Sequence, residues 1–326
     1  MRRFGLPFLT CGFFLSALLG CSKGGNVLTI AFSPRNSETI YVGTTGGGFY
    51  KSRDGGATFN KTSSGLTTYN ITSVAVNPSI TMVVYAGSYG DSVYRSVDSG
   101  HNWILISNGL DDNVGAQAIN SVIVDPKVAE RIYLGTNYGV YKTDDGGSGW
   151  QAFNMGLGNR FVIALAFDPR DRDVIYAGTQ RGIFRTDNAA ETWKIVHPET
   201  REWAINTIAL DRAVPPTLYA GTNKGIFKSS DQGETWLDLV KGFSSRFVAT
   251  IGIDPDSPQI VYAGNNDGIY KTDDAGETWR LLAESPRSVR IFAIQPGRPE
   301  TLFAGTTHGL YKSTDQGKAW TQLKIK

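Results

Sequence analysis

TDDAGETW, residues Thr272–Trp279, is one copy of a motif that recurs along the chain and predicts its fold. Variants of these eight residues occur seven times, at intervals of 41 to 47 residues. A motif with a period of this length is typical of a repeat architecture in which each copy is one supersecondary unit. We call the motif the box; its copies are SRDGGATF from Ser52, SVDSGHNW from Ser96, TDDGGSGW from Thr143, TDNAAETW from Thr186, SSDQGETW from Ser229, TDDAGETW from Thr272 and STDQGKAW from Ser313.

The residue types of the box suit a tight turn. A Ser or Thr hydroxyl and an Asp carboxylate can hydrogen-bond to the backbone of their own turn, and Gly adopts backbone conformations that other residues resist. Six of the seven tryptophans end a box, and Phe59 ends the first copy, so we expect this side chain to pack between neighbouring sheets. Repetition indicates architecture, and we therefore expect no box aspartate to be catalytic.

Between boxes the sequence predicts short strands. In the fourth repeat they are residues 161–167, 174–177, 182–185 and 192–196, which are rich in β-branched and aromatic residues between turn formers. Seven such units predict an all-β chain, a single seven-bladed β-propeller of four-stranded antiparallel blades over residues 26–326. An open solenoid is the alternative, but equal repeats without distinct end caps argue against it. No terminal strand is expected to cross into another blade, so closure would depend on side-chain packing between the first and last blades.

The box resembles the Asp-box, or BNR, repeat of sialidases, xyloglucanase-type glycoside hydrolases, sortilin ectodomains and photosystem II assembly-factor propellers. The stretch IVYAGNNDGIYKTDDAGETW, residues 260–279, is close to the xyloglucanase-like form. The resemblance covers nearly all of the chain after residue 25 and implies a propeller. It implies two functions of different kinds, one a carbohydrate-active enzyme and the other a protein-assembly factor.

The N-terminus reads as an export signal. Arg2 and Arg3 precede an apolar run over residues 4–19, which is shorter than the roughly 20 residues that span a bilayer. The tetrapeptide at residues 18–21 resembles the lipobox of bacterial lipoproteins, which implies lipidation of Cys21, and Ser22 after it implies delivery to the outer membrane of the cell envelope. We therefore divide the chain into a signal peptide (1–20), a lipidated cysteine with a short tether (21–25) and the propeller. An uncleaved anchor and an ordinary signal peptide are the alternatives.

Charge and cysteine content exclude several kinds of site. Without Arg2 and Arg3, 30 basic residues balance 30 acidic ones, so the mature chain lacks the overall basic charge of a nucleic-acid-binding protein. Cys11 would leave with the signal and Cys21 would carry lipid, so no thiol remains for a disulfide or a metal. We expect a monomer that contacts the membrane through its lipid.

The candidate binding residues lie on the face opposite the boxes, which carries the connections between blades and the turns after each second strand. The residue that opens the innermost strand is expected near the mouth of the central channel, and it varies between repeats: Gly25, Tyr69, Gln117, Arg160, Trp203, Arg246 and Arg287. Three guanidiniums and an indole suit an anion or a flat polar ligand. The turns add a second set on the same face, with solvated loop tips as the alternative interpretation: Tyr138, Arg181, Lys224, Asp267 and His308.

Catalysis finds little support in the sequence. Glycoside hydrolysis normally needs two carboxyl groups at a fixed separation, and the candidates on this face do not form an evident pair: Asp111, Asp112, Glu202 and Asp267. None of His101, His197 and His308 has metal-ligand spacing, so we expect no catalytic residue, metal or cofactor. The leading hypothesis is a non-catalytic envelope scaffold that binds a protein or a glycan. A glycosidase-like hydrolase and a purely structural lipoprotein remain alternatives.

Overall fold

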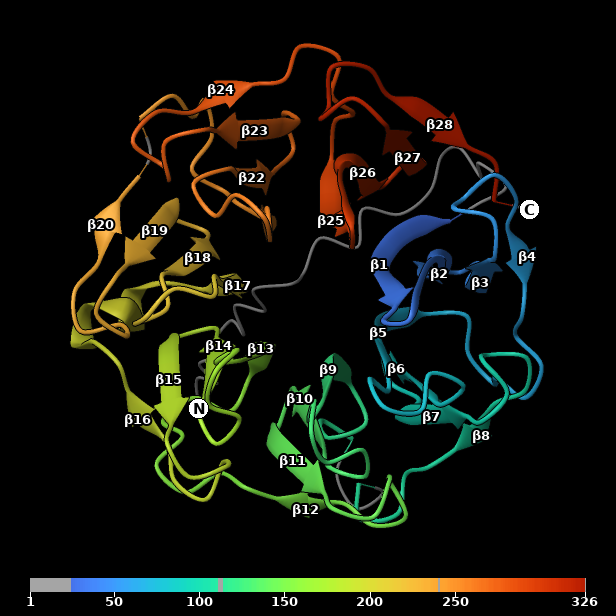
Figure 1. Cartoon of the computed structure of the whole chain (residues 1–326). Helices are drawn as coiled ribbons and strands as arrows, with labels where there is room; N and C mark the ends of the chain where they lie inside the picture. Colours follow the sequence, from blue (N-terminus) through green and yellow to red (C-terminus); the bar gives the residue numbers. More distant parts are fainter. Residues whose placement is uncertain (1–24, 111–113, 240, 326) are drawn as a thin grey trace, which may run out of the picture.

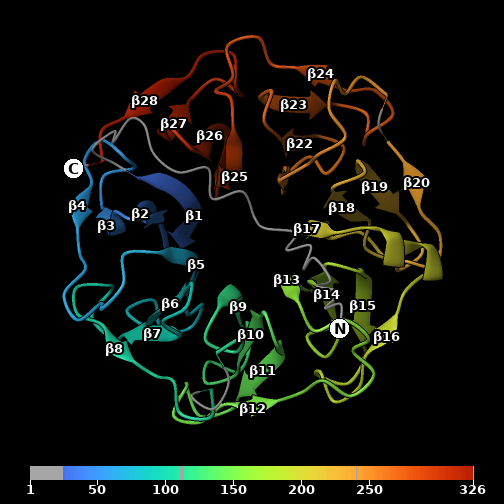
Figure 2. The same ribbon diagram turned by 180° about the vertical axis from the view of Figure 1, so that it is seen from behind.

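The chain folds into a ring of seven sheets. The computed structural model describes residues 25–110, 114–239 and 241–325. Each sheet has four antiparallel strands in sequential order, and Figures 1 and 2 show the first strand of each sheet nearest the centre and the fourth at the rim. The predicted seven-bladed β-propeller is confirmed, and we number its blades 1 to 7 in chain order.

The strand bounds follow the repeat closely. Blade 1 has β1 (Asn26–Ser33), β2 (Asn36–Thr45), β3 (Gly48–Ser52) and β4 (Asn60–Lys61). Blade 2 has β5 (Ile71–Val76), β6 (Val84–Ser88), β7 (Val93–Ser96) and β8 (Ile104–Leu105). Blade 3 has β9 (Ile119–Val124), β10 (Ile132–Thr136), β11 (Gly139–Thr143) and β12 (Gln151–Ala152). Blade 4 has β13 (Val162–Phe167), β14 (Ile175–Thr179), β15 (Gly182–Thr186) and β16 (Lys194–Ile195).

The remaining blades repeat this pattern. Blade 5 has β17 (Ile205–Leu210), β18 (Leu218–Thr222), β19 (Ile226–Ser229) and β20 (Leu237–Asp238). Blade 6 has β21 (Thr250–Ile253), β22 (Val261–Gly264), β23 (Ile269–Thr272) and β24 (Arg280–Leu281). Blade 7 has β25 (Val289–Gln295), β26 (Arg298–Thr306), β27 (Gly309–Ser313) and β28 (Thr321–Leu323). The one helix in the described residues is a 3-10 turn, η1 (Pro198–Glu202), between blades 4 and 5.

Each box folds into a turn held by its own side chains. In blade 1, Ser52 Oγ donates to Asp54 Oδ1 (2.7 Å) and accepts from the N–H of Gly56 (2.8 Å). The N–H of Thr58 donates to the same carboxylate oxygen (2.9 Å). Gly56 has a φ of 91°, in the left-handed region that glycine adopts without steric cost. The predicted turn chemistry of the box is therefore present in the structure.

The degenerate fourth box keeps the same turn. Thr186 Oγ1 donates to Asn188 Oδ1 (2.8 Å), and the N–H of Thr192 donates to that oxygen (3.0 Å). Ala190 takes a φ of 75° where other boxes have glycine. Because the turn extends to Thr192, the outer strand β16 begins only at Lys194, later than the predicted residue 192.

Polar side chains join each blade to the box of the next. Tyr219 Oη on β18 and Lys228 Nζ on β19 both donate to the carbonyl of Ala275, at 3.1 and 3.0 Å. Ala275 lies in the box of blade 6, so one turn receives two hydrogen bonds from blade 5. A Lys or Arg precedes the Ser or Thr of every box, a regularity to which the sequence analysis assigned no role: Lys51, Arg95, Lys142, Arg185, Lys228, Lys271 and Lys312.

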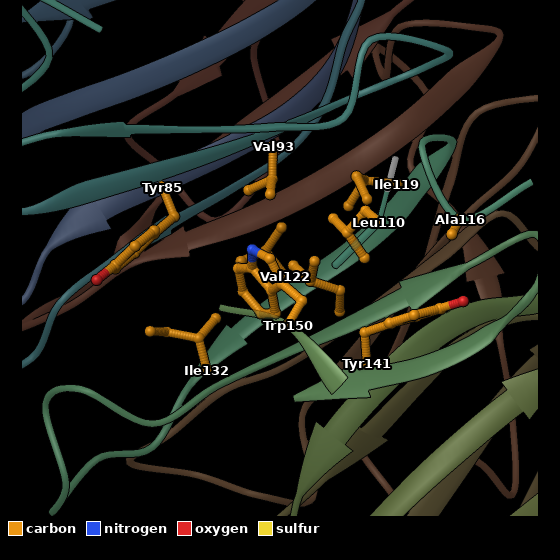
Figure 3. Close-up of a cluster of buried hydrophobic side chains, with 10 residues drawn as sticks. Tyr85, Val93, Leu110, Ala116, Ile119, Val122, Ile132, Tyr141 and Trp150 are labelled. Atoms are coloured by element: carbon orange, nitrogen blue, oxygen red, sulfur yellow. The ribbon is translucent and has the colours of Figure 1, made fainter. Parts of the chain in front are cut away.

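The apolar core lies between blades. Figure 3 shows the cluster between blades 2 and 3, where Tyr85 and Val93 of blade 2 pack with Ile119, Val122 and Trp150. Such side chains are almost fully buried, and the box tryptophan contributes its indole to this contact. Trp150 Nε1 also donates to the carbonyl of Ile106, in the connection that follows the outer strand of blade 2 (2.7 Å). The tryptophan therefore packs between neighbouring sheets, as the sequence predicted.

Blades 7 and 1 close the ring without exchanging a strand. All four strands of each blade come from one continuous segment. Lys312 Nζ donates to the carbonyl of Gly55 (2.7 Å), and Arg298 pairs with Glu38 (2.8 Å). Ile325 is buried in the cluster of apolar side chains at this seam. Side-chain contacts alone therefore hold the ring shut.

Candidate functional site

The face opposite the boxes is where the repeats differ. We call it the variable face: it consists of the turns between the second and third strands and the connections from each fourth strand to the next blade. The box face, on the other side, carries the boxes and the turns between the first and second strands. The backbone N–H of Gly55, in a box, donates to the carbonyl of Glu38 on β2 (2.9 Å), which shows that these two kinds of turn share one face.

The first set of predicted residues lies away from the central channel. The N–H of Gly182, at the start of β15, donates to the carbonyl of Trp203 (3.0 Å), and Gly48, at the start of β3, donates to that of Tyr69 (3.0 Å). In blade 2 the N–H of Ser92, next to β7, donates in the same way to the carbonyl of Gln117 (2.9 Å). These three connections therefore pass beside the third strand of the preceding blade, and Tyr69, Gln117 and Trp203 lie there and not at the predicted mouth of the channel.

Trp203 belongs to the packing between blades. Its side chain is 8% exposed, and its ring stacks on Phe227 of β19 with centroids 3.9 Å apart and planes 14° apart. Trp236, which ends the fifth box, meets it edge-on at 6.0 Å. The prediction that this indole faces a ligand is corrected, because both its face and its edge are covered by aromatic side chains.

The arginines of the first set have separate surroundings. Arg160 is exposed and its guanidinium lies 5.4 Å from the ring centroid of Tyr138. Arg246 points outward, since it pairs with Asp238 on the outer strand β20 (3.5 Å) and donates to the carbonyl of Lys224 (3.2 Å). Arg287 is exposed and forms no ion pair with another residue of the described ranges. The three guanidiniums do not share one binding point.

Tyr69 and Gln117 complete this set. Tyr69 is 51% exposed, and Lys61 Nζ lies 4.4 Å from its ring centroid. Gln117 is half-buried, and its carbonyl accepts from the N–H of Ser92 (2.9 Å). Gly25 precedes β1, close to the turn that follows β2.

The second set lies on the turns as predicted. Arg181 and His308 are exposed at turn tips. Lys224 is 47% exposed, and its Nζ is 4.0 Å from a carboxylate oxygen of Glu202. Tyr138 is 42% exposed, and its ring is the one that the Arg160 guanidinium contacts. These side chains form an exposed, mostly cationic and aromatic fringe above blades 3, 4, 5 and 7.

Two carboxylates in the turns of the variable face, Asp267 and Asp91, are hydrogen-bonded within the protein. Ser244 Oγ donates to Asp267 Oδ2 (2.6 Å) and lies 2.6 Å from Tyr270 Oη. The same arrangement recurs in blade 2, where Asp91 accepts from Tyr94 and Thr67. Recurrence at equivalent positions indicates that these groups tie the turn to the connection. Asp111 and Asp112 lie outside the described residues.

The box carboxylates are held in their ionised form. Hydrogen bonds from Thr58, then Ser52, lower the pKa of Asp54 to about 2, and those from Thr235 and Ser229 lower the pKa of Asp231 to about 2. A general acid for glycoside hydrolysis needs a raised pKa. These carboxylates therefore lack the property that proton donation near neutral pH would require.

Arg290 is a functional candidate that the sequence analysis missed. Among the innermost strands as described, it is the one charged side chain, and it is exposed near the variable-face end of β25. At the equivalent position of other blades, Asn120 Nδ2 donates to the carbonyl of Val162 (2.8 Å) and Asn206 Nδ2 to that of Val248 (2.9 Å). The sequence held a signal for this residue, because the equivalent strand position in the other repeats has an uncharged side chain.

The architecture is shared with solved structures of several kinds. A GH74 xyloglucanase from Xanthomonas campestris superposes with a TM-score of 0.76 at 18% identity, over 92% of this chain and 55% of that enzyme. YCF48 bound to D1 peptide gives 0.70 at 18%, over 89% and 93% of the two chains. The extracellular domain of a putative hybrid two-component system from B. thetaiotaomicron gives 0.70 at 14%, over 91% and 41%.

These neighbours establish the fold alone. Neither a protein-family model nor a curated protein matches the sequence. The chain spans about half the length of the xyloglucanase, and enzymes and a peptide-bound protein occur together among the similar folds. Function must therefore be argued from this chain's own residues.

The described residues contain neither a metal-binding cluster nor a membrane-spanning helix. No group of three or more His, Cys, Asp or Glu side chains in these ranges is arranged to hold a metal ion. No helix within the same ranges is long and apolar enough to cross a membrane.

Proposed function

We propose that this protein is a non-catalytic recognition or assembly scaffold of the bacterial envelope, which binds a protein or glycan partner through its variable face. The observation that carries the proposal is the structural difference between the two faces. The box face repeats the same hydrogen-bonded turn seven times, whereas the variable face displays different exposed side chains in each blade. Exposed loop residues on a rigid scaffold are common binding positions, and Tyr and Arg are enriched at protein interfaces.

A peptide-bound neighbour supports a protein partner. YCF48, which is similar to this chain over almost its whole length, was solved with D1 peptide bound. A propeller of this size can therefore hold a peptide. The exposed Tyr69, Tyr138 and Arg181 supply apolar surface and hydrogen-bond donors for such a contact.

The lipobox resemblance gives the proposed location. Residues 18–21 imply a lipid on Cys21, and Ser22 implies sorting to the outer membrane. Residues 1–24 lie outside the described part of the chain, so the anchor is argued from the sequence. Mass spectrometry of the mature protein tests it, because diacylation adds a defined mass to Cys21.

The alternative function is a glycosidase-like hydrolase, which the similarity to xyloglucanases favours. Of its candidate carboxylates in the described residues, Asp267 accepts a hydrogen bond from Ser244, and Glu202 is exposed, with a carboxylate oxygen 4.0 Å from Lys224 Nζ. We expect no new reducing ends when the protein is incubated with xyloglucan and other polysaccharides. Reducing ends that disappear in the Asp267→Asn or Glu202→Gln variant would establish the hydrolase instead.

Site-specific photo-cross-linking tests the scaffold. A photoreactive amino acid is placed at Tyr69 or Arg181 on the variable face, and at Ser230 or Thr314 on the box face as matched controls. We expect discrete adducts from the first two positions in the source bacterium. Arg160→Gln combined with Arg246→Gln should reduce them at least about tenfold, the effect of losing roughly 1.4 kcal/mol at an interface.

The melting temperature of the double variant should stay unchanged, since both arginines are exposed. Adducts that form only from Ser230 and Thr314, or at equal yield from both faces, would contradict the assignment of the binding face.

A further inference from the structure

The chain enters the propeller on the variable face. Asn26, the first residue of β1, pairs with Thr45, the last residue of β2. The next residues, 46 and 47, form a turn of the variable face, and a Cβ on Gly25 would meet the Thr45 carbonyl oxygen at 2.5 Å. The described chain therefore begins on this side of the molecule.

The predicted tether is no longer than about the height of a blade. Only residues 22–25 separate Cys21 from β1, and five peptide steps span at most about 18 Å. Second strands run from one face to the other, and one of five residues, such as β14, is about 17 Å long before the turns at its ends are added. A lipid on Cys21 would thus hold the variable face closer to the bilayer than the box face.

We propose that the variable face lies against the surface of the membrane in which the Cys21 lipid is inserted, with the box face turned away. The proposal rests on the lipid anchor proposed above and deepens the function, because it places the recognition face in the headgroup layer. The protein would then bind its partner at the membrane surface.

The exposed side chains of the variable face suit that surface. Tyr69, Tyr89 and Tyr138 are 51%, 61% and 42% exposed, and tyrosine is enriched at the membrane–water interface. Arg181, Arg287 and Arg290 are exposed and form no ion pair with any other described residue. Guanidiniums near a membrane are attracted to anionic headgroups.

The box face has the opposite charge. The seven boxes together contain twelve acidic residues and two basic ones, Arg53 and Lys318. Anionic headgroups would repel this face. Tether length and charge therefore favour the same orientation.

Depth-sensitive fluorescence tests the orientation. Acylation consumes the thiol of Cys21 and Cys11 leaves with the signal, so a single introduced cysteine is the one labelling site. Gln180→Cys and His308→Cys report on the variable face, and Ser230→Cys and Thr314→Cys on the box face; all four residues are exposed. Each lipidated variant is labelled with an environment-sensitive dye and reconstituted in phosphatidylethanolamine–phosphatidylglycerol vesicles that contain a nitroxide-labelled phospholipid.

We expect quenching at Gln180 and His308 to exceed that at Ser230 and Thr314 by at least about twofold, because the length of a second strand, about 17 Å for the five residues of β14, separates the two faces. Equal quenching at all four positions, or stronger quenching at the box positions, would overturn the orientation. A mature chain without lipid on Cys21 would overturn the anchor and the orientation together. Neither result would affect the photo-cross-linking result, which reports separately on the proposed function.

Discussion

Trp203 and Phe243 occupy equivalent places in neighbouring seams, although their local sequences do not align. Phe243 stacks on Tyr270 of β23 with centroids 4.3 Å apart, as Trp203 stacks on Phe227 of β19. Phe243 follows a turn at Lys241 and Gly242, whereas Trp203 follows the 3-10 turn η1. Counting back from the next strand therefore placed Trp203 among exposed residues. The path of the connection, which no local signal reveals, decides its burial.

Replacement of Trp203 by Ala should destabilise the propeller. Loss of a buried aromatic side chain leaves a cavity and typically costs about 3–5 kcal/mol. Urea denaturation followed by circular dichroism measures the free energy of unfolding. Arg246→Ala is the control and should change it by less than about 0.5 kcal/mol, since its ion pair is exposed. Similar stability of the two variants would contradict the buried position of the indole.

The box aspartates should make the fold sensitive to acid. The pKa values of Asp54 and Asp231 are about 2, below the ordinary value of 3.8. A carboxylate whose pKa is lower in the folded state contributes stability above its unfolded pKa and loses it on protonation. The melting temperature should therefore fall between about pH 4 and pH 2. Between pH 5 and 8 these groups stay ionised and contribute their full stability, so they should cause no change in melting temperature there.

An amide in the box provides the matched variant for this measurement. The fourth box already has Asn188, which accepts the same hydrogen bonds as the aspartates. The double variant Asp54→Asn, Asp231→Asn should therefore fold and show a shallower loss of stability from pH 4 to pH 2. If the melting temperature of the double variant fell as steeply from pH 4 to pH 2 as that of the wild type, other groups would control acid unfolding.

At the scale of elements, the seams between blades carry the contacts that hold the ring together. Outer strands of two or three residues, such as β4 and β28, contribute few backbone hydrogen bonds. The sheets instead meet through buried aromatic clusters and through the Tyr and Lys bonds to the next box. At the seam between blades 7 and 1, part of this packing comes from Val27 in the first strand and Ile325 after the last strand.

Ile325→Ala should weaken this closing seam. The side chain is 7% exposed, and truncation of a buried isoleucine costs about 2–5 kcal/mol. Thermal unfolding should begin at a lower temperature than in the wild type. Thr321→Ala on the exposed side of β28 is the control and should leave the transition unchanged. If Ile325→Ala also left it unchanged, the C-terminal residues would not contribute to closure.

At the scale of the whole molecule, the structure of the box face could be predicted from the repeats, whereas the side-chain contacts of the variable face could not. Seven boxes at a regular interval predicted seven blades, and the alternation of turns predicted which loops share a face. The variable face offers no such repetition. Asp267 was a possible catalytic carboxylate in the sequence, but in the structure it accepts a hydrogen bond from Ser244.

The blade count, the order of the strands and the box turns could all be predicted from the sequence. The count and order follow from a motif that repeats at a regular interval, and each box turn is held by hydrogen bonds between residues a few positions apart. The burial of Trp203, the outward direction of Arg246 and the exposed place of Arg290 on an innermost strand became known from the three-dimensional structure. Those positions depend on side chains that meet across a seam from segments tens of residues apart, and the path of each connection between blades sets which of them meet.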